Sequence, residues 1–123
     1  MDYAQALHGF WSSFDWKAYD NATVPSEKFS PEMPRITYEV AMSEFDQTNL
    51  VSASLWGEGT WRDVSKKADE IYNYIGLGGV IIPYDDGMIW IKRSSPFATR
   101  MADEDEAVRR IYLQLEIENF TNK

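Results

Sequence analysis

The chain has 123 residues, with 20 acidic and 12 basic side chains and a formal net charge of −8. A chain of this length supports one domain with one core, so we expect a single domain over residues 1–123. The sequence contains no cysteine, which excludes disulfides, thiolate metal sites and cysteine nucleophiles.

The charge and the N-terminal sequence also restrict the partners and the compartment. Proteins that bind by neutralising phosphates carry basic surfaces, so we expect no specific nucleic-acid binding here. An acidic surface does let nucleic acid slide past without sticking, although plain solubility explains the charge more simply. The N-terminal residues MDYAQALHGF lack a signal pattern, and no apolar run approaches the ~20 residues of a membrane span. We therefore expect no membrane partner and a protein that stays in the cytoplasm where it is made.

Residues 2–14 form the first predicted helix, and Asp2 is its expected N-cap. The only histidine, His8, lies at the edge of the polar side with no serine, cysteine or acid fixed beside it by the sequence. We expect it to be a surface residue rather than a catalytic base. The apolar face recurs at helical spacing and consists of Tyr3, Leu7, Phe10, Trp11 and Phe14.

A proline-rich linker and a first hairpin follow. Residues 19–34 hold three X-Pro pairs, which cannot continue a helix, so we expect them to run extended across the surface. Residues 35–45 alternate apolar and polar side chains as a strand does, and residues 50–56 form a second strand. The turn between them is polar, formed by Asp46, Gln47 and Asn49. Two neighbouring strands joined by a short turn predict a hairpin.

The strongest helical signal lies at residues 60–79. Thr60 is expected to cap the N-terminus with its hydroxyl, and the glycines from Gly76 to Gly79 tolerate positive φ at the C-terminal end. Because strands flank this helix and its one apolar face must be buried, we expect it to lie on a sheet. That face spans roughly 100° of the helix circumference and consists of Trp61, Val64, Ala68, Ile71, Tyr72 and Ile75.

The last third of the chain predicts a second hairpin, a loop and a final strand. Residues 80–82 read as a short buried strand, and 88–92 read as its partner across the turn Asp85-Asp86-Gly87. Residues 94–106 are expected to form a loop, because they contain Pro96 and end in an acidic run. Residues 108–120 form the last strand, with one apolar face made by Ile111, Leu113, Leu115 and Ile117.

Together these elements predict an α+β fold with the order α-β-β-α-β-β-β. The simplest packing is a mixed or antiparallel sheet of about five strands covered by the two helices.

Motifs for catalysis or cofactor binding are missing from the sequence. The GLGG run at Gly76 follows a helix, whereas a phosphate-binding loop precedes one. Asp85 and Asp86 suit a hairpin turn better than a cation site. The adjacent acids at 103–106 are typical of a solvated charge run. We therefore expect no catalytic residue, no metal site and no cofactor.

Four side chains are instead candidates for an interface with another subunit or a partner. Trp56 lies on a strand face that is otherwise polar, and such aromatics often anchor interfaces, although the second helix could equally cover it. In the predicted loop, Phe97 and Met101 are apolar and Arg100 is basic, a combination suited to docking. The alternative for Phe97 is that it folds back onto the sheet.

The order of these patterns resembles the tail terminator proteins of long-tailed bacteriophages and prophages, which are also known as tail completion or minor capsid proteins. The resemblance covers nearly the whole chain, although each motif is a loose strand or helix pattern. It rests on the run Ile36-Thr37-Tyr38-Glu39-Val40, the strand ending near Trp56, the helix holding Trp61 and Ile71, and the strands Val80-Ile81-Ile82, Ile89-Trp90-Ile91 and Arg110-Ile111-Tyr112-Leu113.

The resemblance implies a structural protein of the virion tail, assembled in the bacterial host cytoplasm, rather than an enzyme. Such a protein forms a ring, commonly of six subunits, that caps the tail tube and offers its other face to the head–tail connector. Because the genome passes through the ring, an acidic lumen would prevent sticking, and Asp103, Glu104, Asp105 and Glu106 are candidates to line it.

Two alternatives remain open. One is another neck protein of the same assembly, such as a head-completion protein or stopper. The other comes from a different class, a small ligand-binding module or enzyme, which requires a deep pocket with convergent polar groups.

Overall fold

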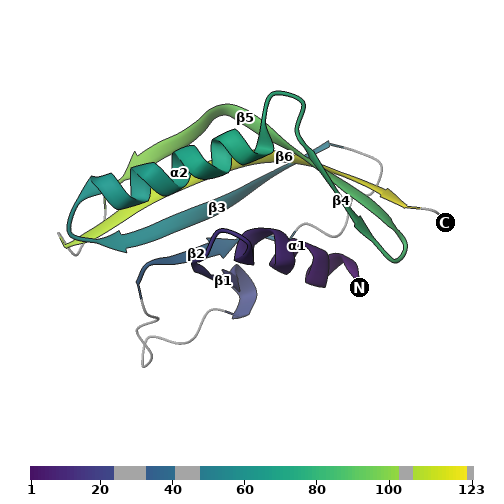
Figure 1. Cartoon of the computed structure of the whole chain (residues 1–123), viewed down its shortest axis with the longest axis horizontal. Coiled ribbons are helices and arrows are strands. Elements are labelled where there is room, and N and C mark those ends of the chain that lie inside the picture. Colours follow the sequence, from purple (N-terminus) through teal and green to yellow (C-terminus); the bar gives the residue numbers. More distant parts are fainter. Residues whose placement is uncertain (24–32, 41–47, 103–106, 122–123) are drawn as a thin grey trace.

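Both helices lie on the same face of one curled sheet (Figure 1). The computed structural model describes residues 1–23, 33–40, 48–102 and 107–121. Its helices are α1 (Tyr3–Ser12) and α2 (Trp61–Ile75), with a 3-10 turn, η1, at Asn21–Thr23. Its strands are β1 (Lys17–Asp20), β2 (Arg35–Tyr38), β3 (Thr48–Glu58), β4 (Val80–Tyr84), β5 (Gly87–Met101) and β6 (Val108–Thr121).

The sheet has six strands in the order β1-β2-β3-β6-β5-β4. The β1–β2 pair is parallel and the other neighbours are antiparallel. The predicted α+β class and mixed sheet are therefore confirmed. The predicted number and order of strands are wrong. The sequence predicts no strand between the first helix and β2, but residues 17–20 form β1 there.

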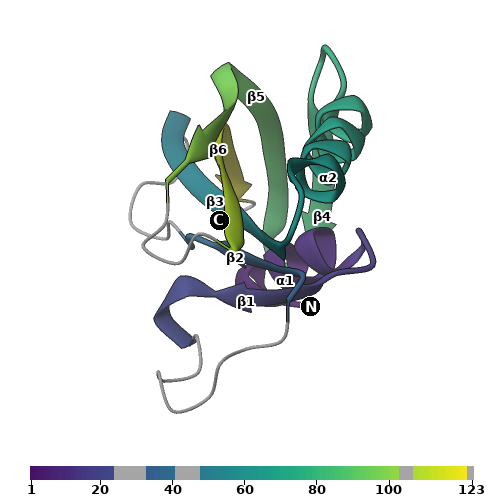
Figure 2. The ribbon, with the colours of Figure 1, turned by 90° about the vertical axis from the view of Figure 1, so that its left-hand side faces the viewer.

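α1 bridges the two edges of the sheet, as the end-on view in Figure 2 shows. At one edge, α1 packs beside β1. At the other edge, its Tyr3 ring lies edge-on against Tyr84 of β4, with ring centroids 5.8 Å apart. The backbone N–H of Asp85 also donates to the carbonyl of Met1 at 2.8 Å. The curl of the sheet thus brings its two edge strands to opposite sides of a single helix.

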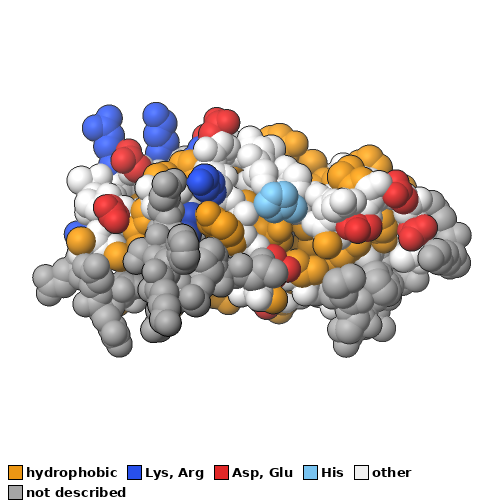
Figure 3. Space-filling model, turned by 90° about the horizontal axis from the view of Figure 1, so that it is seen from below, with side chains coloured by type: hydrophobic (Ala, Val, Ile, Leu, Met, Phe, Trp, Pro, Cys, Tyr) orange, Lys and Arg blue, Asp and Glu red, His pale blue; other side chains and the backbone are white. Residues whose placement is uncertain are grey.

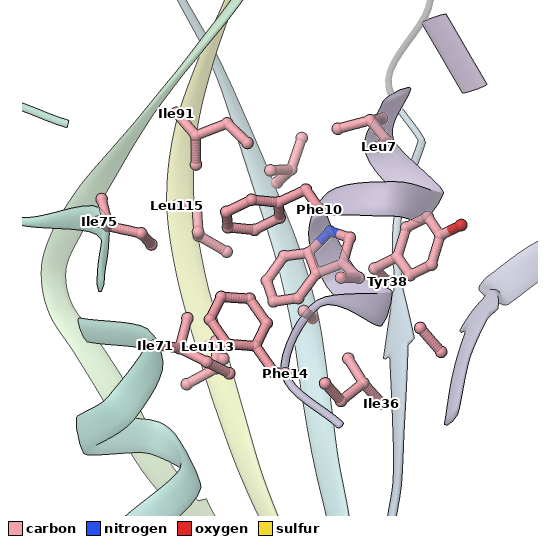
Figure 4. Close-up of a cluster of buried hydrophobic side chains, with 14 of the residues drawn as sticks. Leu7, Phe10, Phe14, Ile36, Tyr38, Ile71, Ile75, Ile91, Leu113 and Leu115 are labelled. Carbon is pink, nitrogen blue, oxygen red and sulfur yellow. The ribbon is translucent and has the colours of Figure 1, made fainter. Parts of the chain in front are cut away.

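The core lies between the helices and the concave face of the sheet (Figure 4). Ile71 and Leu113 are both fully buried, which confirms the expected layer of helix on sheet. α1 adds the largest buried side chain, Trp11, which stacks on Tyr38 with ring centroids 6.0 Å apart. Tyr72, expected on the apolar face of α2, is 42% exposed and lies at the edge of this layer.

The helix ends follow the expectations in part. Asp2 caps α1 by accepting from the Gln5 N–H at 2.8 Å, while the Gln5 side chain accepts from the Asp2 N–H at 2.9 Å. Thr60 precedes α2 in an extended conformation, but its hydroxyl makes no cap bond, so that detail is wrong. Asp63 in the first turn still favours the helix dipole. Gly76 and Gly79 have positive φ values of 72° and 83°, as expected.

The predicted loop at 94–106 is wrong for residues 94–101, which continue β5. The register between β5 and β6 shifts between Arg93 and Ala98. Pro96 falls inside this break, where its missing N–H interrupts no regular ladder. Residues 103–106 lie outside the described residues.

Both predicted hairpin pairings are confirmed, with different boundaries. In the first hairpin, β2 ends at Tyr38, which pairs with Ala53. The rest of the expected strand lies partly outside the described residues, and so do Asp46 and Gln47 of the expected turn. Asn49, also expected in the turn, belongs to β3. In the second hairpin, Tyr84 pairs with Gly87 across a two-residue turn.

Two details of the second hairpin differ from the expectation. Gly87 opens β5 rather than forming the turn, and a Cβ there would lie 1.9 Å from the Phe120 carbonyl oxygen. The strand expected to be buried at 80–82 is instead an edge strand, in which Ile81 is 57% exposed.

Candidate interaction surface

One face of the sheet points away from both helices, and we call it the open face. Since strand side chains alternate between the two faces, the residues between the buried positions of β3 and β6 point outward here. These outward residues are mostly polar and charged, with the exposed Leu50 and two aromatics, Trp56 and Tyr112, among them. They are Leu50, Ser52, Ser54 and Trp56 on β3, and Arg110, Tyr112, Gln114, Glu116 and Glu118 on β6.

Trp56 is held on the open face between two guanidinium groups. The Arg35 and Arg110 guanidinium carbons lie 4.9 and 4.6 Å from the centroid of its ring. The indole Nε1 donates to the Thr37 hydroxyl at 3.0 Å, and the Arg110 Nε donates to the Ser54 hydroxyl at 3.1 Å. α2 lies on the other face of the sheet and does not cover Trp56. The interface role of Trp56 remains a prediction, and the structure adds the two arginines that fix its ring.

A second tryptophan at the same end of the molecule repeats this arrangement. The Trp61 ring, at the start of α2, has the guanidinium of Arg100 4.9 Å from its centroid and that of Arg109 5.6 Å away. Each such cation–π contact is worth about 0.5–2 kcal/mol, depending on its exposure. We call this region the arginine–tryptophan end. It consists of Arg35, Trp56, Trp61, Arg100, Met101, Arg109 and Arg110.

Two arginines of this end, Arg100 and Arg110, stack on rings and have no carboxylate partner among the described residues. In the described part of the chain, no ion pair within 4.0 Å involves Arg93, Arg100 or Arg110. Ion pairs in that part of the chain include those of Lys67 with Glu70, Lys92 with Glu118 and the N-terminal amine with Asp85. Hydrogen bonds from Thr48 and from Lys92 lower the pKa of Glu118. The Glu118 carboxylate therefore already has partners on the two neighbouring strands, β3 and β5.

The opposite end of the molecule has acidic and apolar side chains, and we call it the acidic end. It carries Asp2, Asp85 and Asp86 beside the exposed side chains of Ile81, Met88 and Phe120. In Figure 3 the left half of this face carries Lys and Arg together with Asp and Glu, whereas the right end shows Asp and Glu among hydrophobic side chains. β6 spans the molecule from Arg110 to Phe120, roughly 30 Å at about 3.3 Å per residue.

The structure places three of the four predicted interface residues at one end of the molecule but on two faces of the sheet, since Arg100 lies on the α2 side beside Trp61 while Trp56 and Met101 lie on the open face. Trp56, Arg100 and Met101 lie at the arginine–tryptophan end, and Met101 is 37% exposed. Phe97 lies apart from them, 8% exposed, with its ring against Tyr72 of α2. Phe97 therefore folds back into the core, as the alternative reading had it. The acidic residues Asp103, Glu104, Asp105 and Glu106 lie outside the described residues.

His8 is on the surface, as expected, but it has a serine neighbour that the sequence reading overlooked. Its Nε2 lies 3.2 Å from the Ser12 hydroxyl, one helical turn on, and its Nδ1 lies 3.2 Å from the Tyr38 hydroxyl. Burial, together with the Asp20 carboxylate, raises the pKa of Tyr38. The group borders an open depression of about 450 Å³, lined in part by Ala18. A serine–histidine pair usually has a carboxylate orienting the ring, whereas here a tyrosine hydroxyl occupies that position.

Comparisons complete the description of the surface. Among residues 1–23, 33–40, 48–102 and 107–121, no three metal-binding side chains come together, and no helix is long and apolar enough to cross a membrane. The chain matches no family model, no curated protein and no solved structure.

Proposed function

We propose that this protein is a structural assembly protein of a phage tail. In this proposal it forms a ring, commonly of six subunits, that terminates the tail tube and provides the surface for joining the head. The specific identity comes from the resemblance of the sequence patterns of the strands and helix to those of tail terminators. Its activity is assembly rather than catalysis, its place is the virion tail, and its partners are copies of itself, the tube protein and the connector.

The observation that carries this proposal is the fixed Trp56 ring on the open face. Tryptophan and arginine are the residues that most often dominate the binding energy of interfaces. Their side chains lose much conformational entropy on binding, and stacking and hydrogen bonds have already restricted them here. A half-buried tryptophan between two arginines is therefore a prepared contact for a protein partner.

The charge of the chain fits the same proposal. A net charge of −8 opposes spontaneous association of identical subunits in dilute solution. We expect the ring to form mainly on the end of a completed tube, where a complementary surface is present. DNA leaving the head then passes through without specific binding.

Tail length in electron micrographs tests the proposal. The gene is deleted in the phage or prophage that carries it, and variants are supplied in trans. Wild type restores tails of uniform length joined to heads, whereas Trp56→Ala gives overlong or unjoined tails. Leu77→Ala, which changes a side chain that is 96% exposed in the turn between α2 and β4, serves as the control and restores assembly. Normal particles from the deletion would refute the proposal.

The same experiment separates the alternatives. Tails of normal length that fail to join heads indicate a head-completion protein or stopper, because a terminator also sets the tube end. A ligand-binding module or enzyme would leave particle structure unchanged.

A further inference from the structure

We propose that the arginine–tryptophan end of one copy docks on the acidic end of a second copy, forming the head-to-tail contact of the ring. This inference rests on the proposed function and names the two surfaces that would meet. Its basis is that the two ends of one molecule differ in charge and in chemistry while lying at opposite ends of the same strands.

The arginine–tryptophan end has the chemistry of a carboxylate-binding surface. Guanidinium groups present rigid forks that bind carboxylates in a bidentate manner. The Arg100 and Arg110 groups are positioned by rings and, for Arg110, by the Ser54 hydroxyl, rather than by carboxylates of the described residues. These two guanidinium groups therefore gain ionic partners on docking without giving up an ion pair of their own, whereas Asp85 of the other copy already pairs with its N-terminal amine and would exchange that partner.

The acidic end offers the complementary groups on a rigid support. Asp85 and Asp86 form the two-residue turn between β4 and β5, which is tied down by the bond from the Asp85 N–H to the Met1 carbonyl. Beside the turn, Met88 and Phe120 are paired across β5 and β6 and are 42% and 37% exposed. This apolar area matches the exposed Met101 and the half-buried Trp56 of the other end.

The geometry favours a ring over a two-fold dimer. A contact between two different patches of identical subunits is heterologous, and it either closes into a ring or continues as a filament. The two patches are roughly 30 Å apart along β6, so one copy can use both at once. A second copy is favoured over nucleic acid because one sequence with net charge −8 already supplies both complementary halves.

A charge-swap experiment tests the contact. The first variant carries Arg100→Glu and Arg110→Glu, so both of its ends are acidic. The second carries Asp85→Arg and Asp86→Arg, so both of its ends are basic. Sedimentation velocity at low ionic strength, over a series of protein concentrations, measures weak association as the fraction of oligomer. Each variant alone should lose about tenfold of the oligomer, because like charges then face each other. A one-to-one mixture of the two should restore it, since every contact again joins opposite charges.

Matched controls place the same charge changes on the polar side of α2. Lys66→Glu and Asp69→Arg, which lie further along α2 from Trp61, should associate as wild type does. Because Arg110 also packs on Trp56, Arg100→Glu alone provides a second test at an exposed position, and its melting temperature should equal that of wild type.

Several outcomes would overturn the inference. The inference fails if the one-to-one mixture stays monomeric, or if wild type forms no oligomers at any concentration. It also fails if the controls lose as much oligomer as the variants. Duplex DNA binding by wild type that the first variant abolishes would likewise overturn it, because the arginines would then bind nucleic acid. If the mixture stays monomeric while wild type still gives tails of uniform length, the ring contact lies elsewhere and the proposed function stands. If deletion of the gene leaves particles normal while the mixture restores oligomers, the contact stands and the phage assignment falls.

Discussion

The ring of Phe97 lies edge-on against the ring of Tyr72, with centroids 5.4 Å apart and planes at 64°. This contact joins the second half of β5 to α2, just after the register break in the strand. The Arg93 guanidinium covers the same Tyr72 ring, 3.8 Å from its centroid. A segment that reads as a loop in the sequence is therefore fixed by aromatic packing.

Phe97→Ser should lower the free energy of unfolding by about 3–5 kcal/mol, because it removes a buried ring and leaves a hydroxyl in its place. Met101→Ser, four residues on at an exposed position, should change it by less than about 0.5 kcal/mol. Urea unfolding followed by circular dichroism measures both. Equal stability of the two variants would show that the Phe97 contact does not support the fold.

Ile71→Ala and Leu113→Ala should each cost about 2–5 kcal/mol, since both side chains are fully buried between α2 and the sheet. Asn73→Ala on the exposed side of α2 is the control and should stay within about 0.5 kcal/mol. Thermal unfolding provides the comparison. An Ile71→Ala variant that melts with the wild type would contradict the layer of helix on sheet.

Alanine should have opposite effects at two glycines. At Gly87, a Cβ would lie 1.9 Å from the Phe120 carbonyl oxygen, so Gly87→Ala must push β5 away from β6 and destabilise the protein. At Gly9 in α1, nothing lies within 4 Å of the added Cβ, and Gly9→Ala should stabilise by about 0.5–1 kcal/mol through helix propensity. The two shifts in urea midpoint should differ in sign, and a loss at both positions would contradict this account.

Tyr3 makes the free energy of unfolding depend on pH in the alkaline range. Burial, and secondarily the nearby Tyr84, raises the pKa of Tyr3 from about 10 to about 12. The folded state therefore favours the neutral phenol, and its contribution is complete below about pH 10 and lost as pH rises towards about 12. Tyr3→Phe should lose less stability than wild type across this interval. Urea unfolding at a series of alkaline pH values, with the tyrosinate absorbance followed in parallel, measures the difference; identical pH profiles would contradict it.

Local periodicity was sufficient to predict the elements that carry their own pattern. α2 and β6 each have an apolar face at helical or strand spacing, and both occur almost where the sequence placed them. β1 has no such pattern, because only Ala18 of its four residues is buried. Its strand conformation depends on pairing with Ile36 of β2, a non-local contact that no window of sequence contains.

The sequence predicts single residues of the candidate surface but not which of them lie together. Trp56 stands out in the sequence as an aromatic on a polar face, but its two arginines come from β2 and β6. Their convergence follows from strand register, which pairs Trp56 with both Arg35 and Arg110, and register is not readable from one sequence. Arg100 and Met101 stand out in the sequence only by their side-chain chemistry, and the extension of β5 brings them to the same end as Trp56.

The bridging position of α1 sets the order in which the chain can fold. Helices of this length are marginal in water on their own, so α1 gains its stability from docking. Its docking surface includes Tyr84 and Tyr38, which come from strands near opposite edges of the sheet. α1 leaves the ribosome before β4 does and must therefore wait for β4 before its site is complete. Until then, Phe10, Trp11 and Phe14 are open to water, and the nascent chain depends on rapid completion or on chaperones to avoid aggregation.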